Sequence, residues 1–116
     1  MPCMKSIVIL FVSIATGCTL CGNDPISAEV SPDEERVAIA FIRSCGATTP
    51  FYTQVSILDK PGKLANEVGN IFIVEGKHPV SVQWEGNEKL KIGGTREDGE
   101  ESLRLSEYQG IRISYE

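Results

Sequence analysis

The sequence predicts an all-β domain, either a small antiparallel sandwich or a partly closed barrel of about six to eight short strands. Apolar residues alternate with polar residues in several short runs, which is the pattern of strands with one buried face. Turn-forming residues separate these runs at intervals of about 8–12 residues. Beyond the N-terminal region, no segment keeps a helical period.

The clearest pattern lies in residues 31–58. Ser31-Pro32-Asp33-Glu34 suits a type I turn, because proline fixes φ at the second position. Residues 37–42 follow as a strand with apolar side chains on both faces, so we expect both faces to be covered. After a loop at 44–50, residues 51–58 alternate again and form the next strand. Residues 26–30 precede the turn and complete a hairpin, after a turn-rich entry at 22–25.

The other strands are predicted where apolar or β-branched residues recur, at 70–75, 80–84, 90–92, 103–105 and 111–115. Asp59-Lys60-Pro61-Gly62 and Glu85-Gly86-Asn87-Glu88 are strong turn signals between them. Residues 63–69 suit a short helical turn or an irregular loop equally well.

The N-terminal region has the pattern of a secretory signal peptide. Lys5 precedes an apolar run from Ser6 to Ala15, and the small residues Ala15-Thr16-Gly17 stand before Cys18. The run is shorter than the ~20 apolar residues of a spanning helix, although an uncleaved anchor is the alternative. We therefore divide the chain into a signal peptide (1–17), an anchor and entry segment (18–25) and one all-β domain (26–116).

The residues before Cys18 resemble a bacterial lipobox, with Ala15 where leucine is commonest. This resemblance implies transfer of a diacylglyceryl group to the Cys18 thiol and cleavage before Cys18. We expect an exported protein of the cell envelope that is held on a membrane by this lipid. The net charge of −5 provides no basic stripe for nucleic acid. It would not attract the domain to an anionic membrane either, so attachment would depend on the lipid.

The four cysteines also favour export. Cys3 would be removed with the signal peptide and Cys18 would carry the lipid, which leaves Cys21 and Cys45 in an oxidising compartment. A disulfide between them would stabilise the fold by about 3–4 kcal/mol. The alternatives are two buried free thiols, or a zinc site with His78, for which the spacing is unfamiliar.

Three segments together resemble a family of small exported, lipoprotein-like bacterial proteins without an assigned activity. They are Cys21-Gly22-Asn23-Asp24, Ser31-Pro32-Asp33, and Cys45-Gly46-Ala47-Thr48-Thr49 with Thr53-Gln54-Val55-Ser56 after it. The resemblance covers most of residues 21–92. In that family the first block usually ends in glutamate, the turn reads SPDG, and glycine often follows the paired threonines. This chain has Asp24, Glu34 and Pro50 at those places. The resemblance supports the Cys21–Cys45 pair and implies no catalytic residue.

Catalytic motifs are missing from the sequence. It contains no metalloprotease helix, nucleophile elbow, P-loop or dinucleotide fingerprint, so we expect neither an enzyme nor a cofactor. His78 with Ser44, Cys45 or Thr48 is the arrangement that a hydrolase would need, but an exposed turn histidine explains His78 more simply. The acidic residues 97–101 lack the spacing of a calcium loop.

Three classes of function are left. We favour a non-enzymatic, lipid-anchored envelope module that binds or supports another protein. A small-ligand or carbohydrate binder is second, and a hydrolase that uses Cys45 or a nearby hydroxyl is third. A large concave aromatic pocket would favour the binder, whereas a Cys21–Cys45 disulfide would remove Cys45 as a nucleophile. The aromatic residues that could stack on a sugar, or could instead pack in the core and at its rim, are Tyr52, Trp84, Tyr108 and Tyr115.

Overall fold

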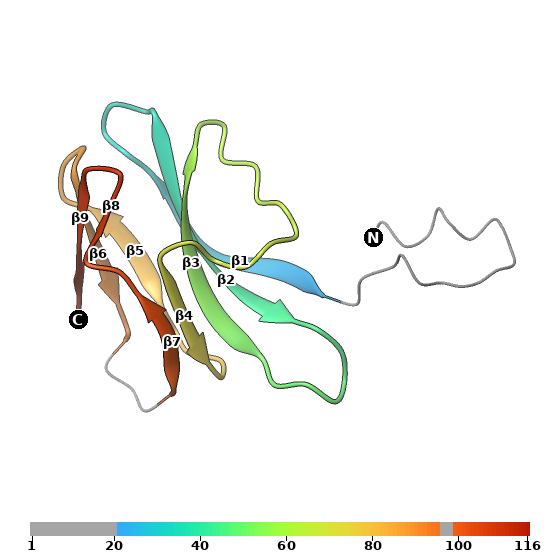
Figure 1. The fold of residues 1–116 in the computed structure, drawn as a ribbon. Coiled ribbons are helices and arrows are strands. Elements are labelled where there is room, and N and C mark those ends of the chain that lie inside the picture. Colours follow the sequence, from blue (N-terminus) through green and yellow to red (C-terminus); the bar gives the residue numbers. More distant parts are fainter. Residues whose placement is uncertain (1–20, 96–98) are drawn as a thin grey trace, which may run out of the picture.

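Two β-sheets pack face to face in the computed structural model, which describes residues 21–95 and 99–116 (Figure 1). The first sheet contains, in spatial order, β1 (Gly22–Val30), β2 (Arg36–Ser44), β3 (Tyr52–Asp59), β4 (Phe72–Glu75) and β7 (Glu101–Arg104). The second contains β5 (Ser81–Trp84), β6 (Lys89–Gly93), β9 (Ile111–Tyr115) and β8 (Glu107–Tyr108). The sheets do not close into a barrel, so the all-β prediction is confirmed in its sandwich form.

Several details differ from the prediction. The described residues form nine strands, because the weak apolar segment near Leu103 and Leu105 divides into β7 and β8 in different sheets. β1 begins at Gly22, where a turn-rich entry was expected. Pro25 is tolerated there because β1 is an edge strand, and the register shifts immediately after it. β6 and β9 run parallel, an exception to the antiparallel pairing.

The β1–β2 hairpin turns as predicted at Ser31. The Glu34 amide donates to the Ser31 carbonyl at 2.8 Å, which closes the turn. The buried Ser31 hydroxyl donates to Asp33 Oδ1 at 2.6 Å and accepts from the Arg36 amide at 3.1 Å. The bond from Ser31 is the main reason why the pKa of the Asp33 carboxyl lies below its usual value. Glu34 has a φ of 61°, a left-handed conformation that glycine adopts more readily.

The main core lies between the two sheets. The first sheet contributes alternating residues of β2, β3 and β4, and the second contributes the inward residues of β5, β6 and β9. The buried members are Ala38, Ala40, Val55, Ile57, Ile71, Phe72, Val74, Val80, Val82, Trp84, Leu90, Ile92, Ile111 and Ile113. The alternation seen in the sequence therefore corresponds to the inner faces of the sandwich.

A second, smaller cluster covers the outer face of the first sheet. Val37, Ile39 and Phe41 of β2 are buried there, with Leu58 and Leu64 packed against them. The cover is the segment between β3 and β4, residues 60–71, which contains no helix and crosses the outside of the sheet (Figure 1). Both faces of β2 are covered, as its sequence predicts, and residues 63–69 are an irregular loop.

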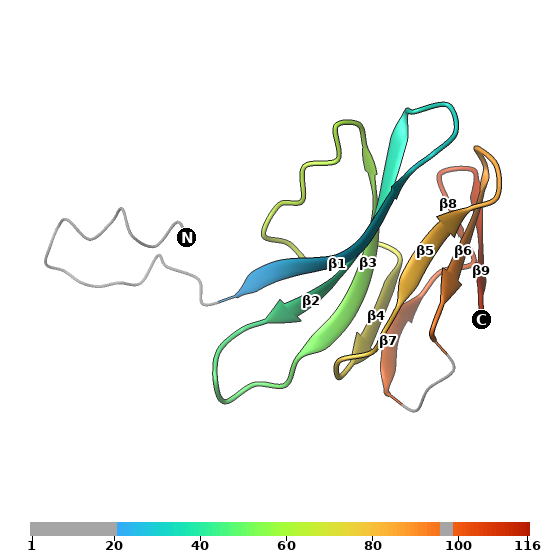
Figure 2. The same ribbon diagram turned by 180° about the vertical axis from the view of Figure 1, so that it is seen from behind.

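The two sheets are also joined along the side formed by β1 and β5 (Figure 2). The backbone amides of Val82 and Trp84 on this edge of β5 donate to Ser27 Oγ at 3.3 Å and to Glu29 Oε1 at 2.9 Å. The Trp84 indole donates to the Glu29 carbonyl at 2.8 Å. Side chains of β1 thus occupy donors that an edge strand would otherwise offer to another chain.

Candidate functional site

The disulfide marks one end of the sandwich. Cys21 stands directly before β1 and Cys45 directly after β2, and their sulfur atoms lie 1.99 Å apart. Gly22 and Ser44 are register partners, so the bond closes the end of the hairpin. Cys45 is therefore bonded to sulfur and is not placed as a nucleophile. Cys18, the predicted lipidation site, lies outside the described residues.

A polar cluster beside the disulfide attaches the 60–71 segment to the sheet. Asn23 and Arg43 are opposite each other in β1 and β2. Arg43 Nη1 donates to Asn23 Oδ1 at 2.8 Å and to Asn66 Oδ1 at 2.9 Å. Asn23 Nδ2 lies 3.0 Å from the Ala65 carbonyl and 2.7 Å from the Glu67 carbonyl, and Asn66 Nδ2 donates to the Cys21 carbonyl at 2.8 Å. These bonds give Asn23 of the Cys-Gly-Asn block a structural role.

Two more side chains hold the other end of the same segment. Gln54 is buried, and its Oε1 accepts from the Gly69 amide at 2.6 Å. Asn70 accepts from the Ile57 amide at 2.9 Å and donates to the Ile57 carbonyl at 3.0 Å. The Asn70 side chain thus makes the pair of bonds that a neighbouring strand residue would make.

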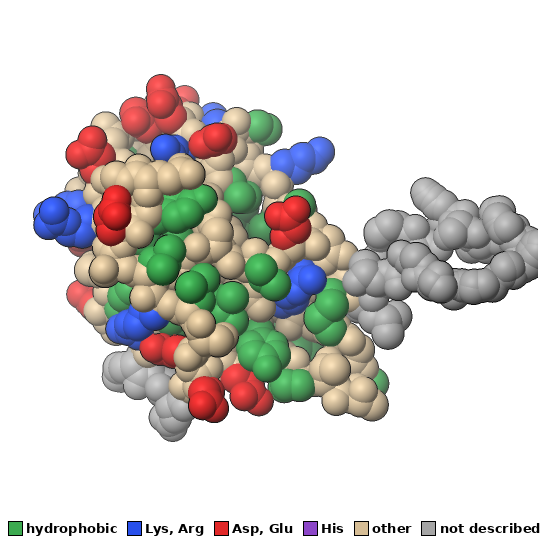
Figure 3. Space-filling view, in the orientation of Figure 1, with side chains coloured by type: hydrophobic (Ala, Val, Ile, Leu, Met, Phe, Trp, Pro, Cys, Tyr) green, Lys and Arg blue, Asp and Glu red, His purple; other side chains and the backbone are tan. Residues whose placement is uncertain are grey.

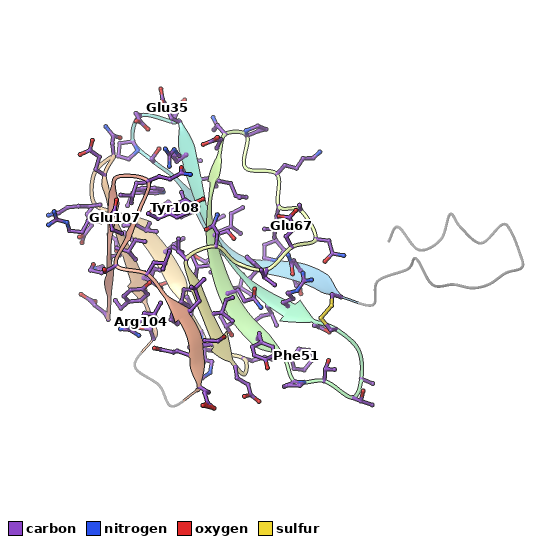
Figure 4. The ribbon with its side chains drawn as sticks, viewed as in Figure 1. Glu35, Phe51, Glu67, Arg104, Glu107 and Tyr108 are labelled. Carbon is purple, nitrogen blue, oxygen red and sulfur yellow. A yellow bond between two sulfur atoms is a disulfide. The ribbon has the colours of Figure 1, made fainter. Side chains whose placement is uncertain are left out.

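A groove of about 680 Å³ opens on the inner side of the first sheet at the disulfide end. Its floor consists of the first residues of β1, the last residues of β2 and the residue before β3, and its wall is the loop from β4 to β5. The lining residues are Gly22, Asp24, Ile26, Ile42, Ser44, Phe51, Lys77, His78 and Pro79. Figure 4 shows Phe51 at the same end of the domain as the disulfide.

The wall of the groove is held by buried hydrogen bonds. Thr53 is fully buried, and its hydroxyl donates to the Gly76 carbonyl at 2.6 Å and accepts from the His78 amide at 3.0 Å. The Gly76 amide donates to the Phe51 carbonyl at 2.7 Å. Gly76 makes the sharp bend with a φ of 100°, which a residue with a side chain rarely adopts.

His78 is turned toward the backbone of its own loop. Its Nε2 lies 2.9 Å from the Glu75 carbonyl oxygen. A carbonyl oxygen only accepts, so Nε2 carries the hydrogen in this geometry. Ser44 lines the same groove as His78, but among residues 21–95 and 99–116 the His78 ring forms no hydrogen bond with Ser44, Cys45 or Thr48. The arrangement of base and nucleophile that a hydrolase requires is not assembled.

The four aromatic residues considered for sugar stacking do not share a surface. Trp84 is buried in the main core, whereas Tyr108 and Tyr115 pack at its rim. Tyr52 lies in β3, one residue from the buried Thr53 and therefore on the opposite face of the sheet. Of the two arrangements considered for these rings, packing in the core and at its rim is the one found for Trp84, Tyr108 and Tyr115.

The rim residue Tyr115 is tightly held. Its hydroxyl donates to the Leu105 carbonyl at 2.6 Å, and the Arg104 guanidinium lies 4.1 Å from the centre of its ring. Burial raises the pKa of Tyr115 to about 12, against the smaller lowering effect of Arg104. Since the phenol is neutral at physiological pH and bonded to backbone, it serves to fix the chain where β7 leads to β8.

No group of three or more metal-binding side chains occurs within the described part of the chain. The zinc arrangement of Cys21, Cys45 and His78 is ruled out because the two sulfur atoms are bonded to each other. Of the acidic residues 97–101, Glu97 and Asp98 lie outside the described residues. Residues 21–95 and 99–116 contain no helix that is long and apolar enough to span a membrane.

The space-filling view gives no sign of a basic stripe on the face that it presents. In Figure 3 the Lys and Arg side chains lie apart from one another, with acidic side chains between them. Such a mixture of both signs of charge is ordinary for a protein surface. Comparison with known proteins found no matching family model, no matching curated protein and no matching solved structure.

Proposed function

We propose that this protein is a lipid-anchored module of the cell envelope that binds or supports another envelope protein and catalyses no reaction. The observation that carries the proposal is the Cys21–Cys45 disulfide, which begins three residues after the lipobox cysteine Cys18. Structural disulfides belong to oxidising compartments. The disulfide and the signal pattern therefore favour the same destination from independent features of the chain.

The geometry around the groove supports a binding or structural role over a hydrolytic one. Cys45 is bonded to Cys21, and the His78 ring is bonded to a backbone carbonyl. Neither group is placed as the nucleophile or base of a hydrolase. Asn23 of the Cys-Gly-Asn block is engaged in holding the 60–71 segment, which accounts for this residue without a reaction.

The test of anchoring uses the two cysteines of the N-terminal region. Cells that express the full chain are fed an alkyne-labelled fatty acid, and the N-terminus of the purified protein is determined by mass spectrometry. We expect label on the wild type and on Cys3→Ala, and a mature N-terminus at a lipid-modified Cys18. Cys18→Ala should lose the label and leave the membrane fraction. A mature N-terminus at any residue other than lipid-modified Cys18 would contradict the proposal.

The test of partner binding is crosslinking in intact cells. We expect the wild-type protein to recover the same envelope protein in repeated experiments, and Cys18→Ala to recover much less of it because the variant is no longer held on the membrane. If repeated crosslinking of correctly anchored protein recovers no constant partner, the interaction part of the proposal fails while the anchoring part stands.

A further inference from the structure

We infer that the groove end of the domain docks on the membrane surface, with Ile26 and Phe51 entering the interfacial layer and Lys77 meeting headgroup phosphates. This inference rests on the proposed anchor at Cys18, because the domain must first be held at a membrane. It specifies the orientation of the domain and the side chains that touch lipid, which anchoring alone leaves open.

Apolar side chains are exposed at the groove. Ile26 and Phe51 are 44% and 42% exposed, and both line the groove. Between them lies Ile42, which follows Ala38 and Ala40 on the inner face of β2. The alanines lie in the core between the sheets, whereas Ile42 lies beyond it and lines the groove. The apolar pattern of the inner face thus continues past the part that the second sheet covers.

The connection between the groove end and the predicted anchor at Cys18 is short. Cys21 is fixed to Cys45 by the disulfide, and the next residues, Gly22 and Asp24, line the groove. Two residues, Thr19 and Leu20, lie between Cys18 and Cys21, so three residue-to-residue steps of at most ~3.6 Å each join the two cysteines. Cys21, at the groove end, therefore lies within ~11 Å of the lipid attachment point at Cys18. At such a short tether the effective concentration of the surface is high, so a weak contact suffices.

A positive charge, that of Lys77, lies beside the exposed aromatic ring at the groove. The Lys77 ammonium lies 4.4 Å from the centre of the Phe51 ring, so the cation and the exposed aromatic side chain form one unit. Aromatic rings and lysine side chains suit the membrane interface, where an apolar body and a polar end meet different layers. Asp24 at the groove and the exposed Glu75 beside it oppose deep entry and strong binding to anionic lipid. The occupant that fits is a zwitterionic surface contacted at the depth of the headgroups.

The experiment places tryptophan at the groove and measures contact with lipid. Mature protein with Phe51→Trp is reconstituted into phosphatidylcholine vesicles whose acyl chains carry bromine near the headgroup. Trp84 is only 8% exposed and supplies a constant background.

Val30→Trp is the matched control, because Val30 is 43% exposed on the same strand as Ile26. The rise of ~3.3 Å per residue places Val30 about 30 Å from Cys21. Val68→Trp is the second control. Val68 is 59% exposed in the 60–71 segment over the outer face, so quenching at this position would indicate closeness to the membrane without insertion of the groove.

We expect brominated lipid to quench the added emission of Phe51→Trp by more than half and the emission of both control tryptophans by little. Adding Lys77→Glu should reduce the quenching at position 51. Equal quenching at positions 51 and 68 would overturn the inference, and so would a Phe51→Trp emission that shifts with protein concentration in the absence of vesicles, which indicates a second copy in the groove.

Mass spectrometry of each preparation separates this inference from the proposed anchoring. A protein with lipid on Cys18 but no quenching at position 51 is anchored and does not dock through the groove. If Cys18 carries no lipid, the proposed anchoring is wrong, and the inference that rests on it fails as well. Circular dichroism and a count of free thiols establish that each variant has the wild-type fold.

Discussion

The two faces of the first sheet are covered in different ways. The inner face packs on a second sheet, whose strands satisfy most of their backbone groups in their own ladder. The outer face is covered by the irregular segment 60–71, which has no ladder of its own. Side chains of the sheet, Asn23 and Gln54, bond to its backbone. The segment's own side chains Asn66 and Asn70 bond in turn to the backbone of Cys21 and Ile57.

The comparison shows what an irregular cover requires. Buried or half-buried backbone groups need partners, and a loop without strand pairing must find them in polar side chains. Arg43 holds one end of the segment through the Asn66 side chain, and Asn70 holds the other end through the backbone of Ile57. Apolar burial alone would cover β2 on both faces, but the outer cover also depends on a few specific polar residues. We therefore expect the inner face to determine global stability and the outer cover to be lost locally.

The largest effect should come from the inner face. Phe72 is fully buried between the sheets and packs against Tyr115 with ring centres 5.4 Å apart. Phe72→Ala should lower the free energy of unfolding by about 3–5 kcal/mol. Leu64→Ala, at a partly buried residue of the outer cluster, should cost clearly less. Urea denaturation measures both. Equal costs would show that the outer cover matters as much as the inner core.

The disulfide should have the next largest effect, because it fixes the edge to which the outer cover is attached through the Cys21 carbonyl. Cys45→Ser should lower the free energy of unfolding by about 2–4 kcal/mol. Cys21→Ser should cost the same, and the double variant should cost no more than either single one. Thiol counting in denatured, non-reduced mature protein supplies the direct check. Two free thiols there would refute the pairing.

Arg43→Met tests the outer cover itself. The variant keeps an aliphatic side chain but loses the bonds to Asn23 and Asn66. We expect a loss of about 1.5 kcal/mol, the lower end of the range for hydrogen bonds to a charged group. The 60–71 segment should become the first site of protease cleavage, and Lys63→Met, which removes an exposed cation of the same segment, should leave the cleavage pattern unchanged. Cleavage first at another place would contradict the assigned role of Arg43.

A stabilising change is expected at the turn between β1 and β2, which belongs to neither the inner nor the outer cover of the first sheet. Glu34 adopts a φ of 61°, a conformation that costs a residue with a side chain roughly 1–2 kcal/mol. Glu34→Gly should relieve this cost and raise the free energy of unfolding by about 1 kcal/mol, without changing protease cleavage of the 60–71 segment. Glu35→Gly is the control, because Glu35 is not among the residues with positive φ. A destabilised Glu34→Gly would show that the turn is not strained.

The smallest effect concerns alkaline pH at the rim of the inner core. The pKa of Tyr115 is about 12 in the folded chain and 10.0 for the ordinary side chain. Above pH 10 the unfolded chain therefore loses this proton first, and stability falls as pH rises from 10 to about 12. Because Tyr115 is half exposed, we expect less than about 1 kcal/mol. The difference in urea midpoint between wild type and Tyr115→Phe at pH 9 and 11 isolates the effect; an unchanged difference would contradict it.

Local pattern was sufficient for much of the fold. The alternation in residues 37–42 and 51–58 predicts two strands, and the apolar residues on both faces of the first predict two covers. The Ser-Pro-Asp turn was predicted because proline and serine restrict the backbone locally. The cysteine pair was inferred from the family resemblance and from the remaining two cysteines, and it lies at bonding distance.

The features that the sequence did not indicate depend on contacts between distant residues. Residues 63–69 have no period that separates helix from loop, and their path is decided by bonds to Asn23 and Gln54, which lie far away in the chain. Arg43 and Asn66 were missed for the same reason, because Arg43 lies beyond the predicted strand at 37–42 and meets Asn23 and Asn66 only in the folded chain.

The positions of strands and turns follow from local sequence, since side-chain alternation and turn residues act over a few neighbouring positions. The tertiary structure alone decided which strands become neighbours beyond the β1–β2 hairpin, the parallel pairing of β6 with β9, and the position of the groove. The groove exists because the second sheet begins at Ser81 and leaves the end of the first sheet to the loop that carries Lys77 and His78. How far the second sheet covers the first depends on the packing of the two sheets, and no local sequence pattern encodes it.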